Sequence, residues 1–195
     1  IVYLPQDHTS GATPGALTPR AMVADNDLAL GRVVEALTHS PFWKSTVVFV
    51  IEDDAQNGPD HVDSHRSPLL VISAYGKGGV IHRFTNTTDA LRTMEEILKL
   101  DALSQYDHYG HPLRDIWRDA PDTAPYTALT PAVSLAEQNP AGTRAARESR
   151  RLDFSEVDAA DMDAFNRVLW MAVKGEQAPY PGTHRMSALE ARRSR

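Results

Sequence analysis

The sequence contains no cysteine, no long apolar segment and no excess of positive charge, and each absence excludes a class of protein. Without cysteine, the 195-residue chain has neither a disulfide framework nor a thiolate metal site. None of its uninterrupted apolar runs approaches the length of about 20 residues that a membrane-spanning helix needs, so we expect no membrane span. The 26 acidic residues outnumber the 20 Lys and Arg and give a net charge of −6, so nucleic acid is not expected as a partner.

The remaining composition is that of a chain able to build a core, with 42% hydrophobic and 24% charged residues. The chain starts at Ile1 inside an apolar run, and no signal segment is visible in the sequence. We therefore expect the chain to be part of a longer protein, and we expect the N-terminal part of that protein to be its partner.

Three apolar runs are predicted to be strands. Residues 46–51 and 69–72 are continuous and rich in β-branched side chains, which is typical of central strands buried on both faces of a parallel sheet. A third, shorter strand is expected at residues 1–4, ended by Pro5. Because helical segments alternate with these runs, the pattern predicts an α/β fold with a mostly parallel central sheet.

Three helices are predicted from end signals and apolar spacing. The first begins at Thr18 and Pro19, and Asp27 interrupts its apolar stripe. Asp27 marks either a local break in the helix or a carboxylate directed at a site. The second is capped by Asn86, and the third covers residues 155–174 before Gly175.

The composition changes twice along the chain and divides it into three predicted parts. Residues 1–117 carry the strands and the first two helices. Residues 118–150 are rich in proline and then in arginine, which indicates an extended arm followed by a solvated helix or linker. Residues 151–195 hold the last helix and a polar tail that is expected to be loose.

Carboxylates and imidazoles gather at the ends of the predicted strands. Ligands bind at the carboxyl ends of strands in open α/β sheets, so these groups are expected to meet at one edge. Consecutive carboxylates after a buried strand repel one another, and a bound cation removes that cost. The residues concerned are Asp7 and His8, then Asp53 and Asp54, and then Asp60, His61 and His65 with Arg66.

A metal site therefore explains the set, with Zn, Mn or Fe favoured by Asp and His ligands and Ca left open by the all-oxygen corners. The alternative is that Asp53 and Asp54 cap a turn and that His61 and His65 are ordinary loop residues. Two other histidines, His108 and His111, either line the rim of a pocket or belong to a solvated loop.

Three segments resemble bacterial phosphoesterases of the alkaline phosphatase superfamily, in particular the phosphoesterase part of large proteins that also carry a β-propeller. The resemblance implies an alkaline-phosphatase-like sandwich, of which residues 1–117 are the C-terminal part. It also implies a periplasmic or secreted protein. The resembling segments are Leu4-Pro5-Gln6-Asp7-His8-Thr9, residues 48–68 and residues 166–175.

The resemblance also implies a site with two divalent metal ions. By position, Asp7, His8 and His65 match ligands of one metal, and Asp53 and Asp54 match the acidic pair at the other. Asp60 and His61 resemble an Asp–His pair of phospholipase C-like relatives, and together with Arg66 they are candidates for substrate or supporting contacts. The nucleophile of these relatives lies upstream of the matching region, and neither Thr9 nor Ser10 is assigned to it.

The function that follows from the resemblance is hydrolysis of a small phosphate ester by in-line displacement between two metal ions. A sulfatase or a phospholipase C-like enzyme would use the same metal frame. A further alternative is a non-catalytic metal-binding or interaction fragment, because no nucleophile is assigned in this chain.

Overall fold

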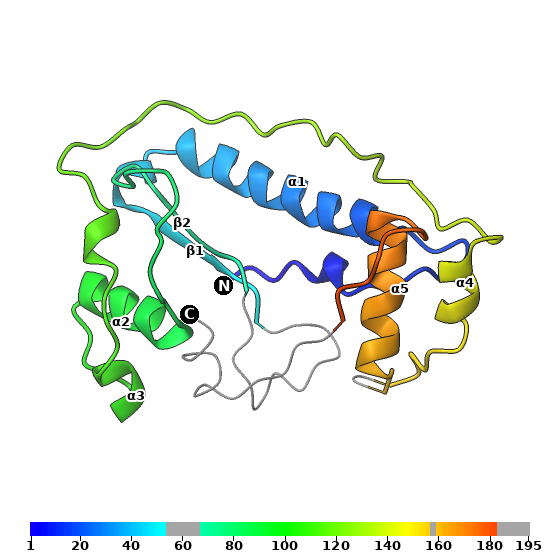
Figure 1. The fold of residues 1–195 in the computed structure, drawn as a ribbon. Helices are drawn as coiled ribbons and strands as arrows, with labels where there is room; N and C mark the ends of the chain where they lie inside the picture. Colours follow the sequence, from blue (N-terminus) through cyan, green and yellow to red (C-terminus); the bar gives the residue numbers. More distant parts are fainter. Residues whose placement is uncertain (54–66, 157–158, 183–195) are drawn as a thin grey trace. The chain divides into compact units, whose positions relative to one another are not determined.

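The computed structural model describes residues 1–53, 67–156 and 159–182, which fall into two compact units. The first unit contains residues 1–32 and the described residues from 128 onward, and the second contains residues 33–53 and 67–127. Helices and a small two-stranded sheet make up the described part of the chain, so the fold is mixed α/β (Figure 1). None of the helices in these ranges is long and apolar enough to cross a membrane.

Helix α5 (Met162–Lys174) provides the two largest buried apolar side chains of the first unit. Phe165 and Val168 are each 1% exposed and lie one turn apart, as the predicted apolar stripe requires. The helix begins later than predicted because the side chain of Asp161 accepts a hydrogen bond from Ala164 N at 2.8 Å and caps it there. Gly175 ends it with φ 96°, which confirms the predicted stop.

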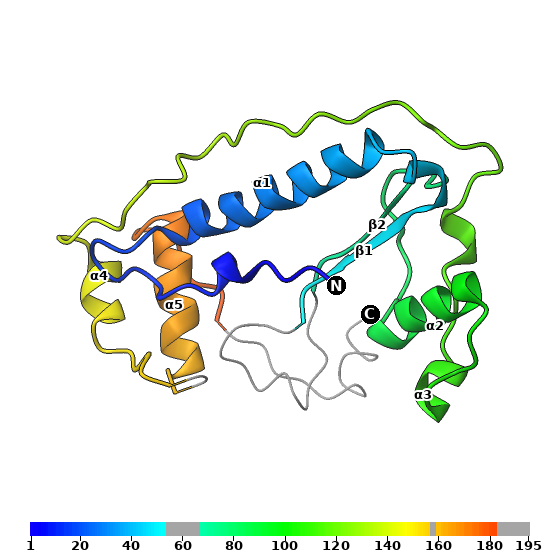
Figure 2. The same cartoon turned by 180° about the vertical axis from the view of Figure 1, so that it is seen from behind.

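Helix α4 (Arg144–Ser149) packs beside α5, as both views of the ribbon show (Figures 1 and 2). Thr143 caps it, and Ala145, Ala146 and Ser149 are buried in it. A solvated helix was one of the two predicted alternatives, and a helix is present, but one of its faces is buried. Small side chains on that face pack beside α5, and the two arginines of the helix, Arg144 and Arg147, are exposed.

Helix α1 (Pro19–Thr38) begins in the first unit and ends in the second. Its predicted start is confirmed, because Thr18 Oγ1 accepts a hydrogen bond from Ala21 N at 3.2 Å. The helix is continuous through Asp27, which is exposed, so a local break at that position was a wrong alternative.

The sheet of the second unit consists of β1 (Val47–Ile51) and β2 (Leu69–Ser73). Both strands were predicted, but they pair antiparallel, with Val47 opposite Ser73 and Ile51 opposite Leu69. The described residues therefore show no parallel sheet, and most side chains of the two strands are only half-buried. A run of β-branched residues fits a half-buried strand as well as a fully buried one, so composition alone did not distinguish the two.

The strand predicted at residues 1–4 is absent, and a 3-10 turn (Pro5–Asp7) follows directly. Ile1, Val2 and Tyr3 are 129%, 67% and 75% exposed, and no described strand pairs with them. An apolar run needs a neighbouring strand to complete its hydrogen bonds before it becomes part of a sheet.

Helix α2 (Thr87–Leu98) is capped by Asn86, as predicted, through a capping box with Asp89. Three of its four buried residues are polar, and these three, Asp89, Thr93 and Glu95, are at most 3% exposed; the fourth is Ala90. The apolar positions that predicted the helix are half-buried or exposed instead, namely Leu91, Met94, Ile97 and Leu98.

The polar face of α2 holds the chain segment that follows it. Glu95 Oε1 accepts a hydrogen bond from Leu103 N at 3.2 Å, and Asp89 Oδ1 accepts one from His111 N at 2.6 Å. Thr93 Oγ1 accepts another from Leu113 N at 2.9 Å. These three hydrogen bonds attach the backbone of residues 103, 111 and 113 to α2 and so fix the path of residues 103–113.

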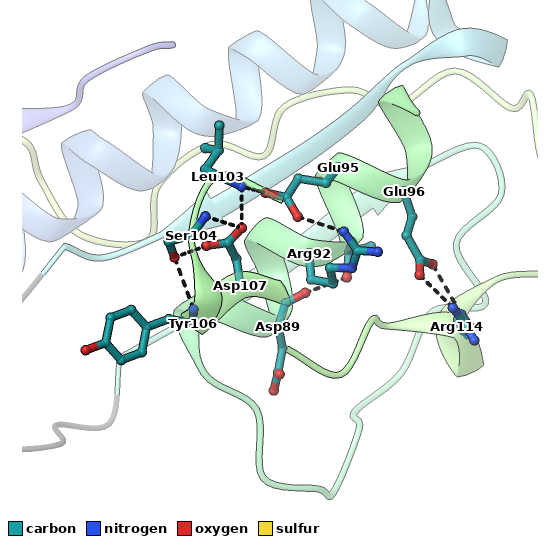
Figure 3. Close-up of polar contacts among 10 residues, drawn as sticks. Asp89, Arg92, Glu95, Glu96, Leu103, Ser104, Tyr106, Asp107 and Arg114 are labelled. Carbon is teal, nitrogen blue, oxygen red and sulfur yellow. Dashed lines mark hydrogen bonds and ion pairs between the residues drawn. The ribbon is translucent and has the colours of Figure 1, made fainter. Parts of the chain in front are cut away.

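Asp107 is the third residue of the short helix α3 (Gln105–His108) inside this segment and completes a capping box with the N-cap residue Ser104 (Figure 3). Its carboxylate accepts hydrogen bonds from the Ser104 hydroxyl, from Leu103 N at 2.7 Å and from Ser104 N at 3.1 Å. The hydroxyl of Ser104, followed by the backbone donors, holds the pKa of Asp107 well below its ordinary range. From the 3-10 turn Arg114–Ile116, Arg114 Nη2 lies 2.6 Å from Oε1 of the half-buried Glu96 on α2, and its hydrogen bonds lower the pKa of that glutamate.

We expect Val168→Ala to lower the free energy of unfolding by about 2 kcal/mol, because it leaves a cavity beside Ala12 and Ala145. Val173→Ala on the same helix is the matched control, since Val173 is 46% exposed. It should change stability by less than about 0.5 kcal/mol. Equal losses in the two variants, measured by denaturant unfolding, would show that α5 does not bury the face described.

Replacing Asp107 with Asn should destabilise the second unit in a pH-dependent way. The native pKa is depressed, so the stability that the carboxylate contributes is present above its unfolded pKa of about 3.9 and is lost as the pH falls below that value. The difference in melting temperature between wild type and Asp107→Asn should therefore shrink from neutral pH to about pH 2. The control is Asp101→Asn, which replaces an exposed aspartate nearby. If the difference in melting temperature between wild type and Asp107→Asn did not change with pH, the stabilising role of the ionised Asp107 carboxylate would be contradicted.

Candidate functional site

Asp7 and His8 lie together on an exposed turn in the first unit. The 3-10 turn Pro5–Asp7 is closed by His8 N, which donates to Pro5 O at 3.2 Å. Pro5 stands at its first position, where its fixed φ favours the turn and its missing N–H costs nothing. The side chains of Asp7 and His8 are exposed, and the two residues, candidates for an oxygen and a nitrogen ligand, are consecutive in the chain at the end of this turn.

The chain just before this pair is held by Asn26 from helix α1. The side chain of Asn26 accepts a hydrogen bond from Gln6 N at 3.2 Å and donates one to Leu4 O at 2.8 Å. A single amide thus pairs with the backbone on both sides of Pro5. This bidentate contact fixes where the turn starts relative to the first half of α1.

The chain just after the pair enters a buried loop. Thr9 is 6% exposed, and its hydroxyl accepts a hydrogen bond from Gly11 N at 3.1 Å. Gly11 has φ +64°, and a Cβ built there would stand 3.0 Å from Ser149 Oγ and 3.2 Å from Val168 Cγ1. The position therefore requires glycine for its backbone conformation and for its close approach to α4 and α5.

Asp53 lies at one end of the β1–β2 hairpin in the second unit. The antiparallel register brings the residues after β1 beside those before β2, with Glu52 N 3.5 Å from Pro68 O. Asp53 and Ser67, which flank the connection between the strands, are both exposed. The residues predicted within that connection, Asp54, Asp60, His61, His65 and Arg66, lie outside the described residues.

The described residues thus bring Asp7 next to His8 and place Asp53 at the end of a hairpin in the other unit. Within residues 1–53, 67–156 and 159–182, no three His, Asp or Glu residues are grouped so that they could hold a metal ion. Carboxylate oxygen and imidazole nitrogen are nevertheless donors that Zn, Mn and Fe accept, so the chemistry of the described candidates fits such ions. The complete ligand set stays a prediction.

The hydroxyl of Thr9 and the carbonyl of Ser10 have contacts inside the loop. Thr9 Oγ1 accepts from Gly11 N, and Ser10 O accepts from Thr13 Oγ1 at 2.8 Å and from Ser149 Oγ at 3.1 Å. Both residues therefore stabilise the conformation of the loop.

A separate hollow of about 550 Å³ lies at the start of α2 in the second unit. Exposed rings of Phe84, Tyr106 and Tyr109 line it together with Arg83 and His111. His111 is among the residues that line this hollow, but its side chain is 87% exposed, so it fits the solvated-loop alternative as well, and His108 does not line the hollow. None of the candidate metal ligands that the structure describes contributes to it.

Three residues around the Asp7–His8 turn were not found from the sequence: Asn26, Asn139 and Ser149. Asn26 lies between two acidic residues on a helix, where its amide gives no signal of its own. Asn139 and Ser149 are separated from the loop they contact by more than 120 residues. No local spacing connects them with it, and only the packing of the folded chain reveals the contacts.

Comparison with family models, with curated proteins and with solved structures found no match to this chain. The resemblance to the alkaline phosphatase superfamily therefore depends on the residues quoted for it. What it implies for the site is therefore a set of predictions. The geometry of the Asp7–His8 turn and of the β1–β2 hairpin is independent of that resemblance.

We expect Asn26→Ala to loosen the turn that carries Asp7 and His8. Loss of a net contribution of about 1 kcal/mol should raise amide hydrogen exchange at Gln6 by about 5-fold. The neighbouring exposed residue provides the control, as Asp27→Ala should leave this exchange rate unchanged. Exchange at Gln6 that is equally slow in wild type and Asn26→Ala would contradict the anchoring role.

Proposed function

We propose that this chain belongs to a metal-dependent hydrolase of phosphate esters of the alkaline phosphatase type. The observation that carries the proposal is the exposed Asp7–His8 pair on a closed turn whose start is held by Asn26 through Leu4 and Gln6. A carboxylate and an imidazole fixed next to each other form half of a tetrahedral metal site. The end of the β1–β2 hairpin supports the proposal, because Asp53 stands there beside the connection that contains the other candidates.

Each predicted residue has a role in this proposal. Asp7 and His8, together with His65, would hold one cation, and Asp53 and Asp54 would hold a second. Asp60, His61 and Arg66 would contact the ester or orient those ligands. When bound, the cations would supply Lewis acidity and neutralise the charge that develops on the oxygens of the transferred group.

The antiparallel hairpin favours this arrangement more directly than the predicted parallel sheet would. In an antiparallel pair the end of one strand meets the start of the next, so ligands that follow β1 and ligands that precede β2 belong to the same end. The proposal extends to an alkaline-phosphatase-like sandwich with a mostly parallel sheet, completed by the N-terminal part of the protein. It also extends to a periplasmic or secreted location.

The test uses the full-length protein and p-nitrophenyl phosphate. Turnover should disappear after chelation and return when Mn²⁺ or Zn²⁺ is added back. Asp53→Asn and His65→Ala should each lose bound metal, measured by elemental analysis, and should lower turnover by at least about 100-fold, because a ligand is removed outright.

The control is Asp101→Asn, an exposed carboxylate outside the predicted ligand set. It should keep both metal content and turnover. Full metal stoichiometry and unchanged turnover in Asp53→Asn and His65→Ala would refute the assignment. Turnover of p-nitrophenyl sulfate in preference to the phosphate would replace the phosphatase with a sulfatase on the same residues.

A further inference from the structure

We infer that Asn139 and Ser149 are positioning residues for the Asp7–His8 pair, because they clamp the loop that follows it. We refer to these two residues, with their contacts to residues 10–18, as the clamp. The inference rests on the proposed function in that the pair is taken to ligate a metal ion. It adds that the C-terminal part of the first unit is needed for the affinity of that site.

Asn139 holds the loop through every polar group it has except its own side-chain oxygen. The two N–H groups of its side-chain amide are shared among the carbonyl oxygens of Gly11, Thr13 and Leu17, each of which lies 3.1 Å from Nδ2. Its backbone N–H donates to Ala16 O at 2.9 Å, and its carbonyl accepts from Gly15 N at 3.1 Å. Asn139 is 5% exposed, so water offers these groups little replacement.

Ser149 holds the same loop from helix α4. Its hydroxyl donates to Ser10 O at 3.1 Å and accepts from Ala12 N at 3.1 Å, and it lies 3.3 Å from Thr13 Oγ1. The residue is 1% exposed. Removal of its hydroxyl would leave the N–H of the buried Ala12 without its described partner, which is costly in a core of small side chains, and Ser10 O would keep only its hydrogen bonds from Thr13.

A short backbone pairing next to Asn139 completes the clamp. Thr18 N donates to Glu137 O at 2.9 Å, and Thr18 Oγ1 donates to Glu137 Oε1 at 2.9 Å. Leu17 forms an isolated antiparallel bridge with Gln138. Residues 137–139 therefore act on the end of the loop that leads into α1.

The clamp bears on the metal ligands through the order of the chain. Asn26 fixes Leu4 and Gln6 on one side of the pair, and the buried loop starts at Thr9 on the other. Only Asp7 and His8 lie between these two anchored stretches. Release of the loop would restore backbone freedom to His8 and to Thr9, and a cation would then have to restrict that freedom again on binding. The clamp should therefore raise metal affinity without touching the metal.

The experiment measures Mn²⁺ binding to full-length protein by titration calorimetry, for wild type, Ser149→Ala and Asn139→Asp. Asn139→Asp keeps the shape of the side chain but presents oxygen to three carbonyl oxygens. Both variants should bind Mn²⁺ about 10- to 100-fold more weakly than wild type, the range found when supporting groups of metal ligands are removed. Hydrogen exchange of metal-free protein should accelerate at residues 10–18 in the same variants.

Ser40→Ala is the matched control, because it removes a hydroxyl whose bonds are confined to Leu37 O and Phe42 N in the second unit. It should keep the wild-type Kd and the wild-type exchange in the loop. If Ser149→Ala fails to fold, Thr13→Val removes one contact of the clamp while it keeps the side-chain volume, and it should weaken Mn²⁺ binding in the same direction.

The outcomes separate the clamp from the proposed function. An unchanged Kd in all clamp variants overturns the inference, and so does a loss that Ser40→Ala shares to the same degree. If wild type binds no Mn²⁺ or Zn²⁺, the proposed function fails, and with it the positioning role. Faster loop exchange in the variants would then show that the clamp holds the loop for a structural purpose alone.

Discussion

The first unit depends on one constraint: a loop with buried carbonyl and N–H groups has to be satisfied by side chains from the opposite end of the chain. Asn139 and Ser149 provide those partners, and Gly11 provides the backbone conformation that lets α4 and α5 come close. The side chains of Ala12, Ala145 and Val168 pack together in one buried apolar cluster at this contact. The unit is therefore held together by polar complementarity around a thin apolar core, which makes each buried hydrogen bond count for more.

The second unit uses the same principle with different residues. Helix α2 buries Asp89, Thr93 and Glu95, and these side chains pair with the backbone of the segment that follows. Asp107, further along the chain, likewise accepts hydrogen bonds from backbone N–H groups, those of Leu103 and Ser104. Carboxylates thus act as acceptors for backbone N–H groups inside the fold, so an acidic composition here reflects structural anchors as well as the candidate metal ligands.

Helix ends could be predicted from the sequence because their signals are local. Thr18, Asn86 and Gly175 act within one turn of the helix they delimit, and all three were confirmed. The direction of the sheet and the buried face of α2 could not be predicted, since both depend on which distant segment arrives as a neighbour. The same distinction applies to the candidate site. Asp7 and His8 could be named as candidates from their neighbouring positions in the sequence, whereas the contacts of Asn26 and of the clamp are found only in the folded structure.

The hairpin register has a consequence for how the protein can tolerate length changes. Ile51 pairs with Leu69, so Asp53 and Ser67 stand level only while both strands keep their present number of residues. One inserted residue in β1 would turn its side chains to the opposite face and shift its end by about 3.3 Å along the ladder. Insertions inside either strand should thus be far more harmful than substitutions that preserve spacing, because they would separate the two ends from which the connecting segment departs.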